Sequence, residues 1–588
     1  MQAQHADDGD PFADPAQVEE EEDQRTFVGE ATLNAGRNAN LTLGTDSLIV
    51  LGITAESKTT RVIPFFNILW ASLTKIDLNI QYTTPIGKSD VQVAYVTYTL
   101  DPSSTTNAEN AKNWVARLLD RAYGVSQRQK RIKVLINPYG GAGKAAKWFT
   151  RDVEPILRAA HCEVDVERTS YMGHAVEIAE KIDMDAYDVI ASCSGDGLPH
   201  EVFNGLAKKS NATEALRRVA VVQLPCGTGN AMSWNLNGTK SCSMAALVMV
   251  KGIRTPLDLV SVTQGQKRII SFLSQAIGIV AETDLGTDNI RWMGSARFTY
   301  GLLVRLLGKT VYPCDIAIKT EIDDKAAIRA HYSANVCKHH QSLKLASTST
   351  STLSHSSTNN DDTSPDTSSP TSIGLPALKY GTVQSPLPPG WTLTPYPTLG
   401  NFYSGNMAIM AEATPIFPAS LPSDGLLDLV TIDGTIGRLK AIASLLAVEN
   451  GTFFDMPHVN MRKVSAYRVV PRFGKWAKPS PPNKVQEKSW VGRVMAALGM
   501  TGVNSKDNNN RDGGYISVDG EKMPFEPFQV EVHRGLGTVL SRSGFVYEAD
   551  GPAGWDGATA TATATANTNT NTSITESSAE AGTAQIER

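Results

Sequence analysis

Apolar positions follow different periods along the chain of 588 residues, and the changes between them mark the expected domains. Residues 25–125 show six short segments of strand character, one of them over residues 68–78, and then one helix. Residues 129–255 alternate buried strands with helices, which predicts βαβ units and an α/β doubly wound parallel sheet. Residues 256–550 return mainly to strands, one of them over residues 268–282, and predict an antiparallel β-sandwich.

Strands followed by a single C-terminal helix resemble, in topology alone, a small pleckstrin-homology-like domain. An unrelated β-rich domain is the alternative for residues 25–125. Several stretches lack apolar periodicity over most of their length, and we expect them to be disordered. They are the acidic N-terminus 1–24, the insertions 341–375 and 475–513, and the tail 551–588.

Composition excludes several classes of protein. The net charge of −5 gives no global field for nucleic acid. The six cysteines form no CxxC pair, which favours a reducing compartment over a disulfide framework, and zinc-ligand spacing is absent. The start of the chain is acidic, unlike a signal peptide, and the sequence has no apolar run long enough to span a bilayer. We therefore expect a cytoplasmic protein, one that can still visit a membrane surface.

Three apolar strands of the α/β region end in glycine-rich loops. Glycine lets backbone N–H groups approach an anion, and the N-terminus of the next helix favours negative charge. One such loop is weak evidence because tight turns also need glycine, but three at successive strand ends would meet at one edge of the sheet. A polyphosphate is the ligand expected there. The loops are Asn137-Pro138-Tyr139-Gly140-Gly141-Ala142-Gly143-Lys144, Ser194-Gly195-Asp196-Gly197 and Pro225-Cys226-Gly227-Thr228-Gly229-Asn230.

Asp196 is unusual in such a loop because a carboxylate repels phosphate. It should contact either a metal ion on the phosphates or the hydroxyl that attacks them, since phosphoryl transfer needs both. The alternative is a turn aspartate that caps the next helix. Pro138 stands where a Walker A motif has glycine, and no GxGxxG follows a strand with a downstream acid, so neither of those nucleotide sites is expected.

Six segments, in this order, resemble the conserved blocks of sphingosine kinases, which belong to the diacylglycerol kinase superfamily of lipid kinases. The resemblance covers residues 130–310 and 400–545. Ser194 before Gly195-Asp196-Gly197 is similar to the sphingosine kinase branch, and the N-terminal extension with serine-rich insertions looks like fungal long-chain-base kinases. The segments are INPYGGAGKA, SGDGLPHEVFNGL, LPCGTGNA, SFLSQAIGIVAETDLGTDNIRWMGSARFTYG, DGLLDLV and VDGE.

The resemblance implies that ATP lies over the glycine loops. Asp196 matches the catalytic aspartate, which would orient and deprotonate the lipid hydroxyl. Tyr139 replaces a residue that is often basic in the family, which puts a side-chain contact to phosphate in doubt but not the backbone cradle. Thr169 is also readable as a structural hydroxyl at a strand end, and the arginines as solvated helix residues. The residues that match nucleotide contacts are Asn137, Gly140, Gly141, Gly143, Thr169, Gly195, Gly197, Gly227, Thr228, Gly229, Arg291 and Arg297.

Two further acids match family positions. Asp284 matches the acid that recognises the amino and hydroxyl head of sphingosine, and one fixed anion beside an apolar slot would select a cationic lipid head. A solvated acid at a strand end is its alternative reading, and Glu282 stands where the family usually has Asp. Asp519 matches the acid that holds Mg²⁺, with a water between them as one option, although Asp-Gly is also a hairpin turn. His200 is expected to brace a helix N-terminus.

The sequence thus predicts an ATP- and Mg²⁺-dependent kinase that phosphorylates the primary hydroxyl of sphingoid long-chain bases. A diacylglycerol or ceramide kinase on the same scaffold is one alternative, and such an enzyme would not need Asp284. A lipid-binding regulatory protein with a degenerate kinase fold is another, although Asp196 and the glycines are all present. The expected partners are a sphingoid base and a membrane surface, reached peripherally through the N-terminal module. A homodimer is left open.

Overall fold

The computed structural model describes residues 32–35, 39–53, 58–100, 105–141, 143–287, 300–301, 311–348, 374–476 and 514–552. The chain forms two compact units. The first unit contains residues 1–131, 148–164 and 241–252, and the second contains residues 132–147, 165–240 and 253–588. The expected N-terminal tail lies outside the described residues, as do most of the two expected insertions and of the C-terminal tail.

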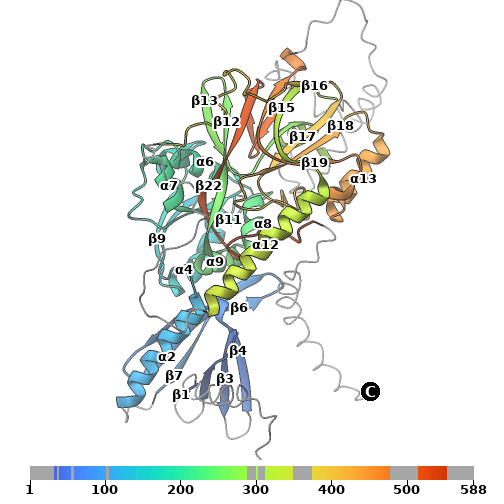
Figure 1. Ribbon diagram of the computed structural model, residues 1–588. Coiled ribbons are helices and arrows are strands. Elements are labelled where there is room, and N and C mark those ends of the chain that lie inside the picture. Colours follow the sequence, from blue (N-terminus) through green and yellow to red (C-terminus); the bar gives the residue numbers. More distant parts are fainter. Residues whose placement is uncertain are drawn as a thin grey trace, which may run out of the picture. The chain divides into compact units, whose positions relative to one another are not determined.

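The first unit begins with seven strands in two antiparallel sheets, followed by helix α2 (Figure 1). The expected strand over residues 68–78 is two strands, because the Thr74 amide donates to the Asp77 carbonyl (2.8 Å) and closes a turn between them. Helix α2 buries Trp114 and Leu118 as its spacing predicts. The elements are β1 (Thr32–Ala35), β2 (Ala39–Leu43), β3 (Ser47–Ile53), β4 (Lys58–Pro64), η1 (Phe65–Asn67), β5 (Ile68–Leu73), β6 (Asp77–Ile86), β7 (Asp90–Thr99) and α2 (Thr105–Tyr123).

Two helices from later in the chain complete the first unit. Ser241, which caps α9, lies with its hydroxyl 2.6 Å from the Asp90 carboxylate at the start of β7. At the other end of α9, the Lys251 ammonium lies 3.7 Å from the centre of the Tyr123 ring on α2, and burial lowers the pKa of Lys251 to about 6. The N-terminal strands therefore pack with helices that follow the glycine loops in sequence: α4 (Glu154–Ala159) and α9 (Cys242–Lys251).

Five strands of the second unit lie side by side in the order β9-β8-β10-β11-β22, and the pairs from β8 to β22 are parallel. Since β9 and β10 lie on opposite sides of β8, the winding reverses between β8 and β10, which is where doubly wound sheets bind ligands. The expected parallel sheet is therefore present. Its elements are β8 (Arg131–Ile136), α3 (Ala145–Trp148), η2 (Phe149–Val153), β9 (Glu163–Arg168), α5 (His174–Lys181), β10 (Val189–Ser194), α6 (Gly197–Leu206), α7 (Ala212–Arg218), β11 (Ala220–Pro225), α8 (Ala231–Asn237) and β22 (Phe528–Ser541).

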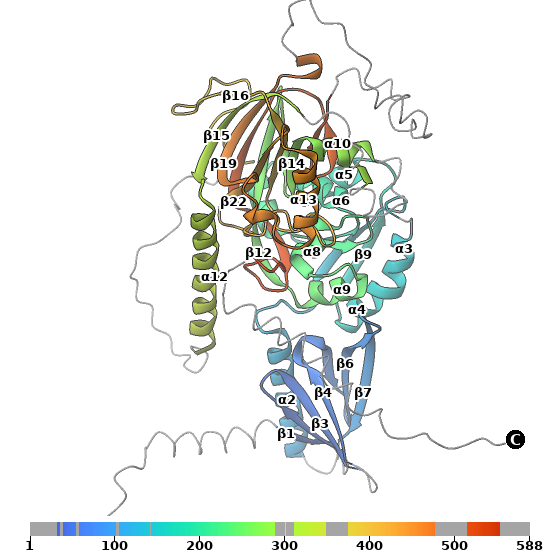
Figure 2. The same ribbon diagram turned by 90° about the vertical axis from the view of Figure 1, so that its right-hand side faces the viewer.

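The antiparallel strands continue from this sheet by hydrogen bonds through β22, and their side chains enclose one apolar core together with those of β22. Strand β12 lies along one edge of β22 and β19 along the other (Figure 2). Strand β11 pairs with that second edge near the C-terminal end of β22, so that hydrogen bonds join 15 strands in one sheet. The two expected halves are thus joined through β22. The antiparallel strands are β12 (Ile253–Gln264), β13 (Lys267–Ser271), β14 (Ser274–Gly278), β15 (Cys314–Ile322), β16 (Thr394–Tyr396), β17 (Leu399–Gly405), β18 (Leu427–Asp433), β19 (Asn460–Pro471), β20 (Ile516–Val518) and β21 (Glu521–Met523).

The prediction of one strand over residues 268–282 is wrong. The segment forms β13, β14 and the start of helix α10, and the break falls at Gly278, whose φ is +101°. A Cβ there would lie 2.7 Å from the Gly400 carbonyl oxygen, so only glycine fits. Residues 341–348 of the expected insertion are helical. The remaining helices are α10 (Ile279–Gly286), α12 (Lys325–Thr348), α13 (Arg438–Glu449), η5 (Phe453–Asp455) and η6 (Gly474–Trp476).

One apolar cluster of the second unit lies around α12 and α13, and we call it the α13 cluster. It is formed by side chains of α12, α13, β18 and the segments around them. Its buried members are Ile328, Tyr332, Val336, Phe417, Ala419, Leu421, Val430, Ala447, Val448, Phe453, Phe454, Val459 and Met461.

Candidate active site

The three glycine loops meet at the carboxyl ends of β8, β10 and β11, as the sequence predicts. Gly141 has a φ of +56°, and a Cβ on it would lie 2.3 Å from the Cys226 carbonyl oxygen of the third loop. A Cβ on Gly227 would lie 2.3 Å from the Cα of Gly195 in the second loop. The loops therefore pack backbone against backbone. Such a cluster of loop amides at a switch point is suited to polyphosphate.

Asp196 lies where the second and third loops meet. Its side chain accepts no hydrogen bond from the first turn of its own helix, α6. The carboxylate instead accepts the backbone amides of Ala231 (3.1 Å) and Met232 (3.0 Å), which begin α8, and the side-chain amide of Gln223 (3.2 Å). Burial raises the pKa of Asp196, these three donors act against the rise, and the charge of Asp519 adds to it. A carboxylate with a raised pKa is suited to accept a proton.

The third loop is braced by two residues that sequence reasoning did not single out. Asn230 has a φ of +55°, and its side chain accepts from the Gly227 amide (2.9 Å) and donates to the Gly227 carbonyl (3.0 Å). Gln223 on β11 accepts from the Ser233 amide (2.8 Å) while it donates to Asp196. The sequence signal for the role of Gln223 was a glutamine within the apolar strand VVQLP. Thr228 lies half-buried between Gly227 and Gly229.

The first loop is closed by its own side chain. Asn137 accepts from the Tyr139 amide (3.0 Å), and the Gly143 amide donates to the Gly140 carbonyl (3.0 Å). Tyr139 itself is exposed. Thr169, after β9, is buried, and its amide and hydroxyl both point to the Ile136 carbonyl (2.9 and 3.4 Å). The observed contacts of Thr169 are therefore those of a structural hydroxyl.

The carboxylate of Asp519 accepts more hydrogen bonds than those of Asp196 and Asp284. It is 2% exposed and accepts five hydrogen bonds: three from the backbone amides of residues 272–274, one from the Ser271 hydroxyl (2.5 Å) and one from His200 Nδ1 (2.7 Å). Burial tends to lower the pKa of His200, but the bond to Asp519 and its charge outweigh this and raise it. His200 thus ties α6 to Asp519, which follows β20, and through Asp519 to the turn between β13 and β14.

These contacts do not fit Asp519 as a direct ligand of Mg²⁺. A carboxylate offers about four lone-pair positions, and five donors already address the two oxygens of Asp519. Within the part of the chain that the structure describes, no group of three or more His, Cys, Asp or Glu side chains could hold a metal ion.

Asp284 lies on α10, not on a strand. It is half-buried, and its carboxylate accepts from the Ser517 hydroxyl on β20 (2.8 Å). Glu282, two residues earlier in the sequence, is also half-buried. The two arginines expected to reach the phosphates, Arg291 and Arg297, lie outside the described residues.

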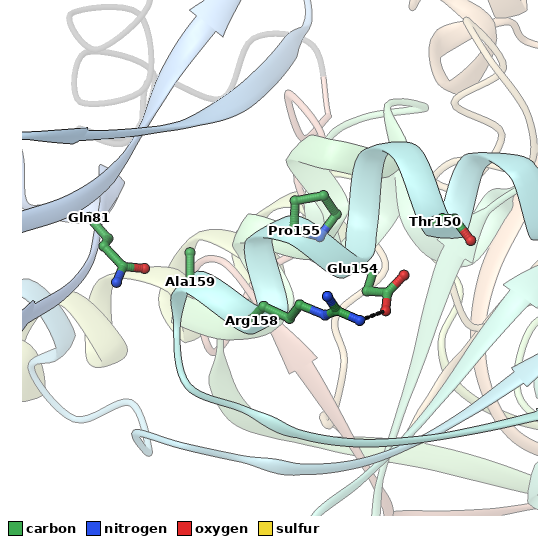
Figure 3. Close-up of a pocket in the computed structure, with 6 residues that line it drawn as sticks. All are labelled: Gln81, Thr150, Glu154, Pro155, Arg158 and Ala159. Atoms are coloured by element: carbon green, nitrogen blue, oxygen red, sulfur yellow. Dashed lines mark hydrogen bonds and ion pairs between the residues drawn. The ribbon is translucent and has the colours of Figure 1, made fainter.

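A separate pocket of about 580 Å³ lies in the first unit, between β6 and the helical segment that contains α4 (Figure 3). In Figure 3, Arg158 points toward Glu154, with which it forms an ion pair. None of the lining residues belongs to the glycine loops, so this pocket is no part of the site. They are Gln81, Thr150, Glu154, Pro155, Arg158 and Ala159.

Family comparisons agree with this geometry. The family described as the diacylglycerol kinase catalytic domain matches residues 131–262, a range that holds all three glycine loops. A second family, described as a domain of unknown function, matches residues 31–124, the N-terminal strands and α2. The fold and the site therefore define a kinase with a catalytic domain of the diacylglycerol kinase type.

Sequence similarity to curated kinases shows which family within this class the chain belongs to. Sphingoid long chain base kinase 4 of Schizosaccharomyces pombe is 30% identical over 82% of this chain and 88% of its own length. Sphingoid long chain base kinase 5 of Saccharomyces cerevisiae is 33% identical over 78% of this chain, which spans 65% of that longer protein. Sphingosine kinase 2 of Arabidopsis thaliana is 26% identical over 70% of this chain and 76% of its own length. The chain belongs to the sphingoid long-chain-base kinases.

Solved structures are more distant. The match to a diacylglycerol kinase from Bacillus anthracis covers 71% of this chain and 99% of that chain, with a TM-score of 0.41 at 14% identity. Among the helices of the described residues, none has the length and apolar character needed to cross a membrane.

Proposed function

We propose that this protein transfers the γ-phosphate of ATP to the primary hydroxyl of a sphingoid long-chain base. The observation that carries the proposal is the position of Asp196: a half-buried carboxylate with a raised pKa, at the point where three glycine loops meet. The loop amides bind the phosphates, and the carboxylate receives the hydroxyl. Membership of the sphingoid long-chain-base kinases supports the choice of substrate.

In the reaction, Asp196 accepts the proton of the lipid hydroxyl. The hydroxyl oxygen forms a bond to the γ-phosphorus while the bond from that phosphorus to the bridging oxygen breaks, and ADP leaves with the electron pair. The α8 amides and Gln223 hold the carboxylate in place for this transfer. Mg²⁺ bound with ATP would neutralise phosphate charge. Because five donors already address the carboxylate of Asp519, we propose no direct bond between it and such an ion.

The test is a phosphorylation assay with labelled ATP and purified protein. We expect sphinganine, sphingosine and phytosphingosine to be phosphorylated, and ceramide and diacylglycerol to be poor substrates. Phosphorylation of the neutral lipids alone would favour the diacylglycerol or ceramide kinase alternative. Absence of any lipid product, with lipid binding intact, would favour the regulatory protein.

Asp284 is the acid proposed to bind the lipid ammonium. Asp284→Asn removes the charge and keeps the shape, so we expect apparent affinity for sphingosine to weaken by about 1–3 kcal/mol, the scale of a lost charge-assisted hydrogen bond. The KM for ATP should barely change, and discrimination against neutral lipids should shrink. Steady-state kinetics with both lipid classes measure this. Asp433→Asn on β18, another half-buried acid with hydroxyl partners, is the matched control. Unchanged sphingosine kinetics in Asp284→Asn would place the lipid head elsewhere.

Peripheral membrane binding is also part of the proposal, and helix α13 supports it. Leu439, Ile442 and Leu446 are 84%, 39% and 58% exposed and recur at i, i+3 and i+7, so they share one face. Arg438 and Lys440 beside them carry positive charge. Apolar and basic side chains together are typical of a helix that lies in a lipid interface.

We expect Leu439→Gln with Leu446→Gln to reduce binding to phosphatidylcholine–phosphatidylserine vesicles at least about tenfold, since each leucine contributes over about 1 kcal/mol when buried in lipid. Turnover on detergent-solubilised base should persist. Vesicle flotation measures the binding. Val125→Gln, at an isolated residue that is 83% exposed in the first unit, is the control. Unchanged flotation would indicate that the N-terminal module, and not α13, binds the membrane. The pleckstrin-homology-like character of that module remains a proposal, and so does a homodimer.

A further inference from the structure

Strand β7 lies at one edge of the three-stranded sheet β5-β6-β7 in the first unit. It pairs with β6 from Asp90 to Thr99 in one unbroken register, and no strand of the described residues pairs with its other edge. The edge of a sheet presents backbone N–H and C=O groups to which a further strand can bind. Strand β7 therefore offers a backbone surface to another extended segment.

Two hydrogen bonds show which backbone groups of β7 face outward. The Val91 amide donates to the Ser243 hydroxyl on α9 (3.0 Å), away from β6. The Leu100 amide, just after β7, donates to the Ile76 carbonyl, just before β6 (2.6 Å). Successive residues of an antiparallel strand direct their backbone groups to alternate sides, so the odd-numbered residues of β7 direct theirs away from β6. Beyond Val91 these residues are Val93, Tyr95, Thr97 and Thr99.

This outer edge of β7 lacks the features that usually prevent strands from pairing. Proteins protect sheet edges with charged side chains, prolines, bulges or short strands. Residues 91–99, VQVAYVTYT, contain no charged residue and no proline, and their register with β6 has no bulge. The Tyr95 side chain is 81% exposed. The one acid of the strand, Asp90, stands at its start and accepts from the Ser241 hydroxyl.

The other strands of the described residues that pair with a single neighbour are protected or short. Strands β4, β9 and β13 each contain at least two charged residues. Strand β5 has a bulge in its register with β6. Strands β1, β16 and β21 are only three or four residues long. Strand β7 is thus the long edge strand of the described chain that is open to pairing.

The sequence of β7 fits a second copy of the same strand. A two-fold axis at Tyr95 would place Tyr95 opposite the partner's Tyr95 and Val93 opposite the partner's Thr97. Residues near such an axis meet their own copies, so a charged residue there would face a like charge, and β7 has none between residues 91 and 99. The three opposed pairs at this edge can form about six backbone hydrogen bonds. The two tyrosine rings would meet as a cross-strand aromatic pair.

We propose that two copies of this chain pair through β7 about a two-fold axis at Tyr95, so that their three-stranded sheets form one continuous sheet. Strand β7 contains no residue of the glycine loops, so the inference is independent of the proposed function. Full-length wild-type protein should sediment as a dimer that dissociates on dilution. Sedimentation velocity over a dilution series measures this. Because a two-fold contact closes on itself, larger aggregates are not expected.

A charge swap at Tyr95 tests the position of the axis. Tyr95→Lys and Tyr95→Glu each place two like charges opposite one another, so each variant alone should raise the dimer Kd at least about tenfold. Because the Tyr95 side chain is largely exposed, neither charge should disturb the fold. An equimolar mixture of the two variants should recover the dimer, since opposite charges then meet. A residue that lies opposite any other surface would give no such recovery.

Val62→Lys is the matched control. Val62 is an apolar residue on β4, which also pairs with a single neighbour, and its side chain is 57% exposed. The same change of charge at Val62 should leave the dimer Kd unchanged.

Amide hydrogen exchange of the wild-type protein gives a second measurement, one that needs no substitution. The amides of Val93, Tyr95 and Thr97 should exchange slowly at concentrations where the dimer forms and faster after dilution. The amides of Ala94 and Val96, which face β6, should exchange slowly at every concentration.

Each result decides the inference. A wild-type protein that is monomeric at every concentration would overturn it and would indicate a different partner for β7. A dimer that persists in Tyr95→Lys, or a mixture of the two variants that stays monomeric, would overturn it as well. Equal loss of the dimer in Val62→Lys would do the same, since added charge alone would then explain the effect. Exchange at Val93, Tyr95 and Thr97 that does not depend on concentration would place the contact elsewhere.

Discussion

Asp196→Asn should reduce turnover by roughly two to four orders of magnitude, the usual contribution of a general base. The substitution removes the proton acceptor while an amide of the same shape still fills the place between the loops. ATP binding should persist, because the backbone amides of the glycine loops are unchanged. Single-turnover kinetics on a sphingoid base, together with equilibrium binding of ATP, measure the two quantities separately.

The pH dependence gives this prediction a second readout. A general base must be ionised, so activity falls as pH falls through its pKa in the folded enzyme. Because burial raises that pKa, the acid limb of the kcat/KM profile should lie above the ordinary range of an aspartate, and it should vanish from the residual activity of Asp196→Asn. Near-normal turnover in the variant would show that Asp196 only accepts the α8 amides, and the chemical role would fail.

The location of the site could be predicted because its determinants are local. Each glycine loop follows a buried strand, and parallel strands place their carboxyl ends at one edge whatever the rest of the chain does. Strand order then brings β8 and β10 together, and the close approach of Gly141 and Gly227 to neighbouring backbone shows why glycine stands there. The use of Gln223 and Asn230 as braces was not predicted, since polar residues near a strand end carry no distinctive spacing.

Features that depend on distant contacts could not be predicted. The apolar, β-branched run through Ile279 has strand character, but Gly278 turns the chain against Gly400 and a helix follows. Asp90 and Ser241 meet although 151 residues separate them, and that contact joins α9 to the N-terminal strands. Periodicity contains no information about such pairs. A domain boundary drawn near residue 125 therefore cuts through packing that the first unit uses.

Asp519 shows the same limit at the site itself. Resemblance assigned it to a metal, and Asp-Gly alone indicated a hairpin turn. The partners of its carboxylate come from two places: the turn at residues 271–274 and His200 on α6. Its own backbone has a φ of +53°. The side chain joins the helix after the catalytic loop to the strand that leads to α10. This bracing explains how Asp196 and Asp284, 88 residues apart by number, are held in one unit.

Asp519→Asn should lower the free energy of unfolding by about 3–5 kcal/mol, the usual effect of breaking a buried charged pair. The asparagine side chain has an NH₂ group in place of one carboxylate oxygen. This NH₂ group must face donors that bind an oxygen in the wild type, so backbone amides or His200 lose their acceptor. Urea unfolding measures the change. Glu521→Gln, in the same hairpin but exposed, should shift it by less than about 0.5 kcal/mol.

Magnesium distinguishes the two roles of Asp519. If the five donors account for its carboxylate, Mg²⁺ without ATP should leave the unfolding midpoints of wild-type protein and Asp519→Asn unchanged, and the gap between them should persist in a chelator. If Asp519 instead binds the ion directly, wild-type protein should gain stability with Mg²⁺ and the variant should not. The contrary result is that Asp519→Asn is as stable as wild-type protein in a chelator and loses only the stabilisation by Mg²⁺. That result would show that the carboxylate is a metal ligand and that its hydrogen bonds do not stabilise the fold.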